Sequence, residues 1–310
     1  MTIPQPPDRT IAAAGLIVSY AVIIGFTDNF VLGISEEVGL WQLHLTRSVL
    51  AMALLIALAP LMGLKLWPRS WGGVTARSAL HGVGIMIYFG ALGFLPVAVV
   101  AAGLFTAPIF VLLISGLVYR QRIGPYRIAA VAIGFLGVIL VLGPLAQEGE
   151  SLAALLPVAA GALYAMGNIA TRQWCANETA ETLLAGFFVG LGVLGAIGMA
   201  VLTFLPVEVP AGPLGYLLRG AVWPSGNAFF WITVQAVGSL IGVGLAIRAY
   251  QIADAGRVSV LEYTILPASA FWTWLLWGEV LGGVAWIGMA LIAAAGILIA
   301  MRARAEEARP

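Results

Sequence analysis

Ionisable side chains interrupt long apolar stretches of the sequence at Asp28, Arg47 and Glu262, and Arg248 stands near the end of a further stretch. Charged groups in such surroundings are costly and usually face a cavity or a partner. At the rise of a helix, Asp28 and Arg47 each lie about 10 Å or less from one end of their segments, so they can pair there. Glu262 can meet Arg248 or Arg257 at the opposite face. We favour an ion pair at each face that gates a closed state; the alternative makes Asp28 or Glu262 a proton carrier.

Polar and aromatic residues recur at helical spacing in two other segments. The sets are Tyr164, Asn168 and Thr171, and Trp231, Gln235 and Ser239. Spacings of i, i+4 and i+7 or i+8 place each set on one helix face. Further residues can add to the same wall, namely Tyr20, His81, Tyr88, Ser259 and Tyr263. The alternative is that Asn or Gln only bonds a neighbouring helix. Because the stripes come from both halves of the chain, we favour a substrate-binding cavity.

Two prolines stand inside apolar segments, Pro108 within Val97–Val118 and Pro267 within Val258–Trp277. A proline lacks an N–H donor and clashes with the carbonyl four residues earlier, so the carbonyls of Leu104 and Tyr263 are expected to lose their helical partners. Non-helical backbone in a membrane is tolerated where it lines a cavity. The pair therefore indicates a central site in which these carbonyls can meet an ammonium group. The alternative is a simple kink in each helix.

Other motifs with chemical meaning are weak. The run Gly190–Gly195 satisfies G-x-G-x-x-G, but it lies within a long apolar stretch without a preceding strand, so nucleotide binding is not expected. No cluster in the sequence has metal-ligand spacing, and a lone cysteine, Cys175, excludes an internal disulfide. A net charge of +1 gives no argument for nucleic acid. We therefore expect no cofactor, no metal and no catalytic residue.

The composition is that of an integral membrane protein. Of 310 residues, 61% are hydrophobic and 9% are charged, and the mean hydropathy is +1.02. A soluble domain carries about 25% charged residues. At about 20 residues per span, the apolar runs predict ten helices joined by short turns. Their expected limits are 11–33, 40–62, 76–95, 97–118, 125–143, 152–174, 182–204, 227–250, 258–277 and 283–301.

The charges favour one orientation of these helices. All of the 15 lysines and arginines except Arg47 and Arg219 lie near the N-terminus or in turns on the same side. The opposite loops are acidic and hold Glu36, Glu37, Glu148, Glu150, Glu208 and Glu279. By the positive-inside rule, both termini are cytoplasmic.

The two halves of the chain share one plan. An offset of 159 aligns Pro108 with Pro267, and an offset of 144 aligns Tyr20 with Tyr164. Five helices per half is an odd number, so the second half must cross the membrane in the opposite sense. The sequence therefore predicts an all-α integral membrane protein of ten transmembrane helices, with one five-helix repeat in residues 1–150 and an inverted copy in residues 151–310.

Several of these residues resemble a known family. The prolines of the fourth and ninth helices, the pair Gly278–Glu279, the Gly-rich tenth helix and Arg47 are similar to the ten-helix EamA-type branch of the drug/metabolite transporter superfamily. The resemblance implies a bacterial inner-membrane exporter of metabolites, with aromatic amino acids as the best-known cargo of the nearest-looking members. The first half departs from the pattern, because it has Tyr119–Arg120 where the second half has Gly278–Glu279.

The preferred interpretation is a secondary transporter that exports small amphiphilic metabolites, including amino acids, by alternating access. A polar, aromatic and almost uncharged wall suits neutral or zwitterionic substrates that carry a ring. The lipid bilayer is the other partner, and a monomer or a weak homodimer is expected. The alternatives are a membrane-embedded enzyme, which would need paired catalytic groups at one depth, and a passive pore.

Overall fold

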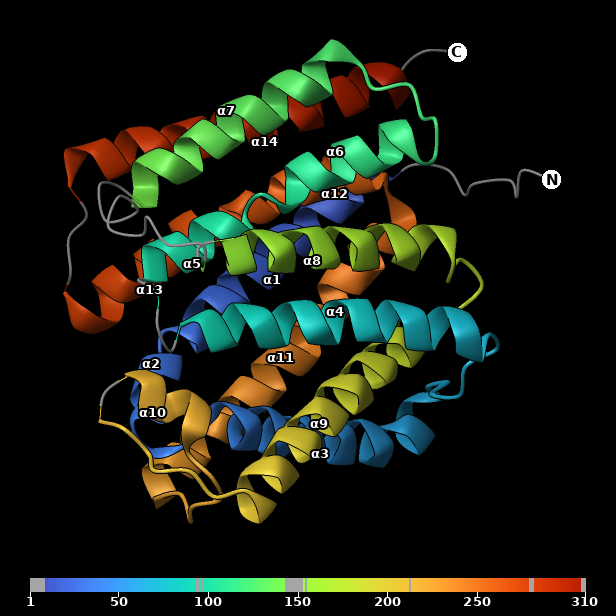
Figure 1. The fold of residues 1–310 in the computed structure, drawn as a ribbon. Coiled ribbons are helices and arrows are strands. Elements are labelled where there is room, and N and C mark those ends of the chain that lie inside the picture. The colour runs from blue at the N-terminus through green and yellow to red at the C-terminus, as the bar shows by residue number, and fades with distance from the viewer. Residues whose placement is uncertain are drawn as a thin grey trace.

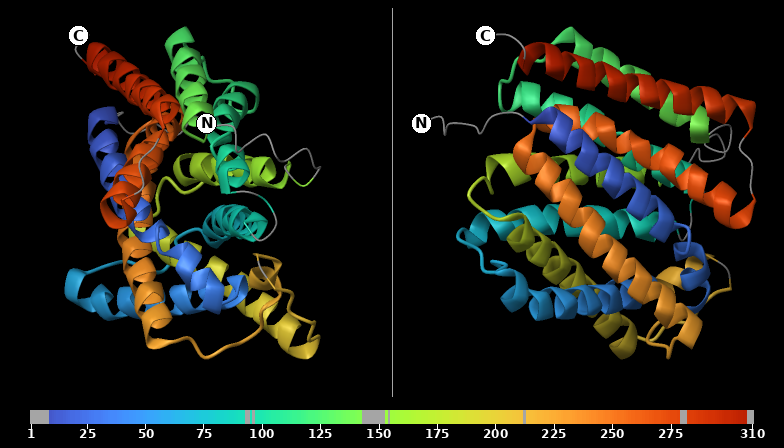
Figure 2. Two further views of the ribbon diagram at one scale, coloured as in Figure 1. Left: turned by 90° about the vertical axis from the view of Figure 1, so that its left-hand side faces the viewer. Right: turned by 180° about the vertical axis from the view of Figure 1, so that it is seen from behind.

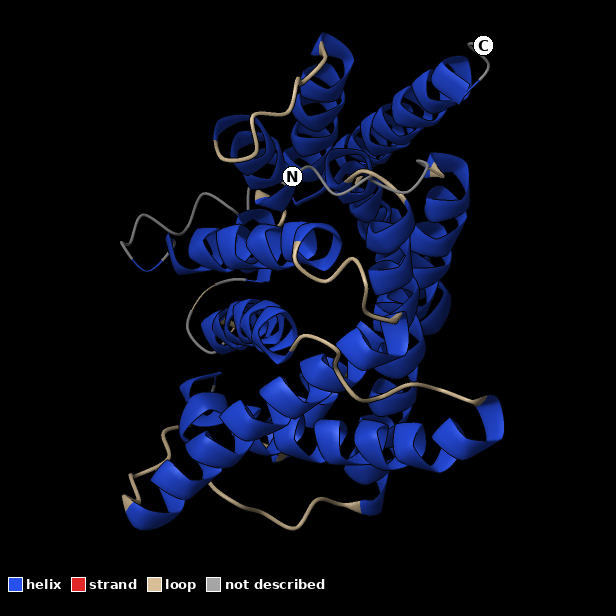
Figure 3. Ribbon diagram, turned by 90° about the vertical axis from the view of Figure 1, so that its right-hand side faces the viewer, coloured by secondary structure: helices blue, strands red, loops and turns tan. Residues whose placement is uncertain are grey.

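A computed structural model describes residues 9–92, 95, 97–142, 153, 155–211, 213–278 and 282–307 of the chain. Within these ranges the regular structure is helical and contains no strand (Figure 3). The acidic loop residues Glu148, Glu150 and Glu279 lie outside the described residues. All-helical architecture, as predicted, is therefore confirmed for the part of the chain that the structure describes.

The helices follow one another with short connections. In the first half they are α1 (Thr10–Asp28), α2 (Val31–Glu37), α3 (Leu40–Met62), α4 (Trp71–Ala91), α5 (Val97–Leu104), α6 (Ala107–Leu117) and α7 (Pro125–Leu142). In the second half they are α8 (Leu155–Gln173), α9 (Ala180–Phe204), α10 (Pro213–Leu218), α11 (Gly226–Ile252), α12 (Ala255–Leu261), the 3₁₀ helix η3 (Glu262–Thr264), α13 (Ile265–Trp277) and α14 (Gly283–Glu307).

Six helical segments are long and apolar enough to cross a membrane, and Pro125–Val141 is a shorter apolar helix. The six are Thr10–Glu37, Leu40–Met62, Val100–Leu117, Ala180–Phe204, Gly226–Ile252 and Gly283–Arg302. Each of the ten predicted ranges overlaps a helix or a run of consecutive helices. The chain is thus a multi-pass membrane protein by the length and composition of its helices.

The predicted limits differ most at the fourth helix of the structure. The range 76–95 was expected, whereas α4 begins at Trp71 and ends at Ala91. Its N-terminus is stabilised by Ser70, whose side chain accepts a hydrogen bond from the Gly73 N–H. The carboxylate of Glu178, distant in sequence, accepts hydrogen bonds from the backbone N–H groups of Arg69 and Ser70. These caps satisfy N–H groups that a helix start leaves unpaired, so the helix extends further toward its start than apolarity indicates.

The helices pack in four main pairs. The helix α7 lies along α14 at the top of Figures 1 and 2, and α3 packs against α9 at the opposite edge of the bundle. Between these edges, α1 packs against α11, and α4 packs against α8 (Figure 1). The α7–α14 and α3–α9 pairs therefore lie at the two edges of the bundle, and the α1–α11 and α4–α8 pairs lie between them.

Glycines allow the close approach that these pairs require. A Cβ atom added at Gly242 of α11 would lie 2.9 Å from the Ile24 side chain and 3.4 Å from the ring of Tyr20 on α1. A Cβ atom at Gly195 of α9 would lie 2.8 Å from the backbone of Trp41 and Leu45 on α3. Small residues permit such backbone approach where lipid gives helices no hydrophobic reason to associate. These two glycines therefore let α1 approach α11 and α3 approach α9.

Both predicted proline positions interrupt a helix. The helix α5 ends at Leu104, and α6 begins at Ala107 with Pro108 in its first turn. In the second half, α12 passes through η3 into α13, whose first turn contains Pro267. Proline is favoured in the first turn of a helix, where its missing N–H costs nothing. Each proline therefore starts a new helix.

The first and last helices meet at the same end of the bundle. Arg257, on α12, donates to the Thr10 hydroxyl at 3.2 Å and to the Tyr126 hydroxyl at 3.2 Å. The guanidinium of Arg302, on α14, lies 5.9 Å from the centre of the Tyr126 ring. These contacts place the start of α1 and the last turns of α14 on one face, which we call the Thr10 end. This agrees with an even number of membrane crossings.

Candidate substrate cavity

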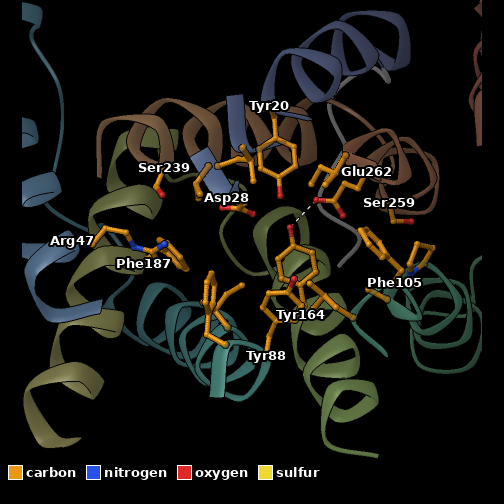
Figure 4. A pocket seen from close by; sticks show the side chains of 18 residues that line it. Tyr20, Asp28, Arg47, Tyr88, Phe105, Tyr164, Phe187, Ser239, Ser259 and Glu262 are labelled. Atoms are coloured by element: carbon orange, nitrogen blue, oxygen red, sulfur yellow. Dashed lines mark hydrogen bonds between the residues drawn. The ribbon is translucent and has the colours of Figure 1, made fainter. Parts of the chain in front are cut away.

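A cavity of about 120 Å³ opens among the central helices. Figure 4 shows the side chains that line it, and all come from α1, α3, α4, α8, α9, α11 and the two interrupted helices. The lining residues are Tyr20, Ile24, Asp28, Arg47, Ile85, Tyr88, Phe89, Leu104, Phe105, Ala107, Pro108, Tyr164, Phe187, Ser239, Val243, Ser259, Glu262 and Ile265. Both halves of the chain thus contribute to one cavity with six aromatic rings and three charged groups.

One side of the cavity holds a hydrogen-bonded set that we call the Arg47 network, formed by Asp28, His44, Arg47, Gln235 and Ser239. The Gln235 amide nitrogen donates to the Asp28 carboxylate at 2.8 Å. Its amide oxygen accepts from the Arg47 guanidinium at 3.1 Å and from the Ser239 hydroxyl at 2.9 Å. Arg47 also donates to Nδ1 of His44 at 3.1 Å. The side-chain amide of Gln235 therefore connects the Asp28 carboxylate to the Arg47 guanidinium.

The opposite side holds what we call the Glu262 cluster, formed by Glu262, Tyr164 and Tyr250. The Tyr164 hydroxyl donates to one carboxylate oxygen at 2.7 Å, and the Tyr250 hydroxyl donates to the other at 2.8 Å. Glu262 is the first residue of η3, where α12 gives way to α13. In Figure 4, Arg47 and Glu262 stand on opposite sides, with Asp28, Tyr20 and Tyr164 between them. The break in the helix thus presents the carboxylate to the cavity.

The prediction that Asp28 and Glu262 lie at opposite faces of the protein is wrong, because both line the same cavity. The predicted ion pairs are wrong as well, since the one ion pair among the described residues joins Arg127 to Asp254 at 3.0 Å. Gln235 stands between Asp28 and Arg47 instead. The expectation of an almost uncharged wall is also wrong, because Asp28, Arg47 and Glu262 all line the cavity.

The predicted partners of Glu262 point elsewhere. Arg257 is turned toward the Thr10 end, where it donates to Thr10 and Tyr126. Arg248 is exposed and donates to the Gln251 side chain at 3.4 Å. Neither arginine lines the cavity. The gating role predicted for Arg248 has no supporting contact, because its side chain lies on the outside of the protein.

Seven of the residues predicted to form the wall line the cavity: Tyr20, Tyr88, Leu104, Pro108, Tyr164, Ser239 and Ser259. Tyr20 and Tyr164 are the residues that the offset of 144 aligns. They reach the cavity from α1 and α8, the first helices of the two halves. The polar stripes therefore indicated the correct helices, although not every residue on them reaches the cavity.

His81 and Asn168 lie behind the cavity wall. The His81 ring donates through Nε2 to the Asn168 side-chain oxygen at 2.9 Å, and it packs edge-on against Tyr164. A Cβ atom added at Gly167 would overlap the His81 ring, so this glycine makes room for it. The pair joins α4 to α8, which is the interhelical bonding that was weighed as the alternative. Neither residue lines the cavity, and contact of either with a substrate stays a prediction.

Gln235, Trp231, Tyr263 and Pro267 also stand outside the lining. Gln235 is buried at the centre of the Arg47 network. The Trp231 ring stacks on Phe30, with 3.4 Å between ring centres. Tyr263 is fully buried, and its hydroxyl donates to the Phe105 carbonyl at 3.2 Å. Of the two residues whose carbonyls were expected to meet a substrate, Leu104 lines the cavity and Tyr263 does not.

Sequence reasoning missed several residues of the site. The apolar and aromatic members of the lining that were not singled out are Ile24, Ile85, Phe89, Phe105, Ala107, Phe187, Val243 and Ile265. The type of an apolar residue in a membrane helix does not by itself indicate whether the side chain faces lipid or a cavity. Ile24 follows Tyr20 by one helical turn, and Ile85 precedes Phe89 by one, so the helical spacing was available as a signal. Tyr250, which holds Glu262, had no such signal.

The described residues contain no group of three or more histidine, cysteine, aspartate or glutamate side chains that could hold a metal ion. Cys175 is buried at the end of α8, and burial raises the pKa of its thiol to about 11. The thiol is therefore protonated at neutral pH and chemically inert.

Membrane-length helices around a cavity with charged groups and aromatic rings are the arrangement of a membrane transport protein. Residues 11–143 match the EamA-like transporter family. The riboflavin transporter of Rhizobium johnstonii is 29% identical over 240 residues, covering 77% of this chain and 73% of that protein. The riboflavin transporter of Vibrio cholerae is 26% identical over 254 residues, covering 80% of this chain and 78% of that protein.

A third relative, the pseudopaline exporter of Pseudomonas aeruginosa, is 25% identical over 255 residues, covering 82% of this chain and 83% of that protein. A crystal structure of a protein superposes with a TM-score of 0.75 and 22% identity, covering 95% of this chain and 99% of that chain. The fold is therefore shared with a solved protein over nearly the whole length. The predicted resemblance to EamA-type transporters is confirmed, and the relatives are transporters rather than enzymes by name. They give no support to the narrower expectation of amino-acid cargo.

Proposed function

We propose that this chain is a secondary transporter that moves a small, ring-bearing organic molecule through the central cavity by alternating access. The observation that carries this proposal is the cavity itself, which is lined by aromatic rings and three charged groups from both halves of the chain. Ionisable groups inside membrane proteins mark substrate or ion pathways. A transporter needs no catalytic pair, which agrees with a site built of binding groups.

The proposal includes the ten-helix inverted repeat, with halves at residues 1–150 and 151–310. Its support is the pattern of packing, in which α1 packs on α11 and α13, while α8 packs on α4 and on α5 with α6. If α1 and α8 are equivalent first helices, α4 and α11 are equivalent third helices, and the interrupted helices are equivalent fourth helices. Each contact of one half then has a counterpart in the other. Rocking of such repeats about a shared site would expose it alternately to the two sides.

The substrate class follows from the walls of the cavity. Rings from Tyr88, Phe89, Phe105, Tyr164 and Phe187 offer faces and edges to a planar group. The Arg47 guanidinium donates hydrogen bonds and the Asp28 carboxylate accepts them, so this side suits a ring edge that carries both acceptors and donors. A flavin has such an edge, and two relatives are riboflavin transporters. Riboflavin is therefore the first substrate to test.

A zwitterionic amino acid with a ring is the second candidate, favoured by the size and charges of the cavity. An engineered cavity of roughly 150 Å³ admits one benzene ring, and this cavity measures about 120 Å³. Arg47 can bind a carboxylate, and Glu262 can bind an ammonium group on the opposite side. A tricyclic flavin would require the cavity to widen further than a single-ring amino acid would. Export from a bacterial cytoplasm, with both termini cytoplasmic, remains our expectation for either substrate.

Uptake into proteoliposomes tests this function. The purified chain should give saturable uptake of riboflavin or of labelled phenylalanine, and the transported compound should compete with its own unlabelled form. Replacing Tyr88, which lines the cavity, by Leu should raise the half-saturating concentration. The matched control is Phe230→Leu, which removes an exposed ring from α11. Rapid, unsaturable flux of unrelated ions would instead indicate a passive pore and overturn the proposal.

The proposed orientation has a separate test. A reporter enzyme fused after Pro310 should be active only in its cytoplasmic form, because the charges of the chain favour that side for both ends. Periplasmic activity of the fusion would contradict the orientation while leaving the cavity and its substrate untouched.

A further inference from the structure

Glu262 is a buried carboxylate with no cationic partner. Its two oxygens accept hydrogen bonds from the hydroxyls of Tyr164 and Tyr250, and no lysine, arginine or histidine in the described ranges forms an ion pair with it. The residue is 5% exposed and faces the cavity. Two neutral hydroxyls stabilise a carboxylate but do not neutralise it. A charge that leaves water without a countercharge is costly, and the group can avoid this cost by taking up a proton.

The neighbouring elements supply no compensating charge. Tyr20 faces Glu262 from α1, Tyr164 from α8 and Tyr250 from α11, and all three are neutral phenols. Next in the chain, Tyr263 turns its hydroxyl to the Phe105 carbonyl. The arginine nearest in sequence, Arg257, is engaged at the Thr10 end.

The charged groups on the other neighbouring elements are directed to partners of their own. Arg127 of α7 pairs with Asp254 at 3.0 Å, so it is directed to another acid. Across the cavity, Arg47 and Asp28 are joined through Gln235. Among the described residues of the cavity wall, Glu262 is therefore the acid whose charge is not balanced by its own contacts.

We propose that Glu262 binds and releases one proton in each transport cycle, and that Asp28 stays ionised beside Arg47. This inference rests on the proposed transport function and specifies its coupling. The proton adds to one carboxylate oxygen of Glu262 and later leaves from the same atom to water in the cavity. No other bond is made or broken. When the acid is formed, the tyrosine hydroxyl at the protonated oxygen must turn away or accept a hydrogen bond from the new O–H group.

The position of Glu262 links this proton to movement of the helices. Glu262 begins η3, the turn between α12 and α13. Its carboxylate ties that turn to α8 through Tyr164 and to α11 through Tyr250. Protonation weakens these two charge-assisted hydrogen bonds, because a neutral acid is a poorer acceptor. Uptake of the proton thus loosens the attachment of the interrupted helix at the point where it can bend.

Infrared difference spectroscopy on the full chain in lipid tests the proton site without any substrate. Spectra recorded while the buffer is changed from alkaline to acidic should show a carboxylic-acid C=O band that appears in the parent. The band should be lost in Glu262→Gln and retained in Asp28→Asn. Tyr250→Phe should shift its frequency, because one hydrogen bond to the carboxyl group is gone. A band lost in Asp28→Asn and kept in Glu262→Gln, or no titrating band at all, would overturn the proposal.

Transport gives the second test, with riboflavin and phenylalanine as probes. In the parent, a pH gradient should drive accumulation of the transported probe. In Glu262→Gln the pH gradient should no longer drive accumulation, and the rate of exchange that remains should be the same with and without the gradient. Accumulation that still follows the pH gradient in Glu262→Gln would contradict the proposal. If neither probe is transported, the proposed function fails, and the infrared result alone decides the proton site.

Discussion

The Arg47 network and the Glu262 cluster hold one carboxylate each in the same cavity, but they stabilise it by different means. Asp28 is linked to a guanidinium through the Gln235 amide, whereas Glu262 accepts from two tyrosine hydroxyls. Asp28 therefore has a positive charge one side chain away. Glu262 has only the dipoles of two hydroxyl groups. The difference teaches that burial by itself does not set the role of an acid, since the charges within reach decide whether it stays ionised.

Neither acid is repeated in the other half. At the offset of 159, Glu262 aligns with Gly103, where an added Cβ atom would overlap Pro157 of α8. At the offset of 144, Asp28 aligns with Arg172. Tyr20 and Tyr164, by contrast, are repeated and both line the cavity. The aligned pair Tyr20 and Tyr164 thus contributes two rings to the wall, whereas Asp28 and Glu262 have no acidic counterpart in the other half.

The largest effect on stability is expected from removing the guanidinium of Arg47. Arg47→Met leaves the buried Asp28 without its countercharge, which should lower the free energy of unfolding by about 3–5 kcal/mol. Thermal unfolding in detergent measures this loss. Arg248→Met is the matched control, because Arg248 is exposed and bonds only to the Gln251 side chain in the described contacts. Equal losses in the two variants would contradict the idea that Arg47 compensates a buried charge.

Neutralising the two acids should have opposite consequences for stability. Asp28→Asn leaves Arg47 buried without a carboxylate, so the free energy of unfolding should fall by about 1–3 kcal/mol. Glu262→Gln removes a charge that had no countercharge, so stability should stay equal or rise. Denaturation of both variants at neutral pH makes the comparison. If Glu262→Gln unfolds more easily than the parent protein, the ionised carboxylate of Glu262 is compensated in the folded state, and the prediction is contradicted.

Variants of the two tyrosines of the Glu262 cluster distinguish an effect on substrate binding from an effect on proton coupling. Tyr164→Phe and Tyr250→Phe each remove one hydrogen bond to the carboxylate, worth about 1.5–3 kcal/mol when the acceptor is charged. Tyr164 lines the cavity and Tyr250 does not, so only Tyr164→Phe should also raise the half-saturating substrate concentration. Both should alter the pH dependence of turnover. A substrate-affinity loss in Tyr250→Phe as large as that in Tyr164→Phe would mean that the cavity extends to Tyr250.

The smallest expected effect concerns the reactivity of cysteines placed beside each acid. Ser239 and Ser259 both line the cavity, the first within the Arg47 network and the second near Glu262. A thiol at Ser239→Cys should react with a small maleimide a few-fold faster than one at Ser259→Cys, because a guanidinium favours the thiolate and a carboxylate disfavours it. The background is low, since burial raises the pKa of Cys175 to about 11 and its thiolate forms only as the pH approaches that value. Cys175→Ser serves as the control, and the reverse order of rates would contradict the assigned charges.

The sequence alone determined the features that depend on local chemistry and on length. Apolar runs of membrane-spanning length predicted the helices, because hydrocarbon requires each spanning segment to satisfy its own backbone. Pro108 and Pro267 predicted the two interruptions, because a proline cannot supply an N–H wherever the chain places it. The alignment of Tyr20 with Tyr164 predicted a shared wall, and both residues line it.

The tertiary structure alone decided which side chains meet. Depth counted along a straight helix placed Asp28 and Glu262 at opposite faces, but tilt and the break at η3 bring both to one cavity. Helical spacing placed Gln235 and Asn168 on polar faces, yet it could not distinguish a face turned to a ligand from one turned to another helix. The partner of a buried acid depends on the rotation and crossing of several helices at once, and no local pattern in the sequence of one helix carries that information.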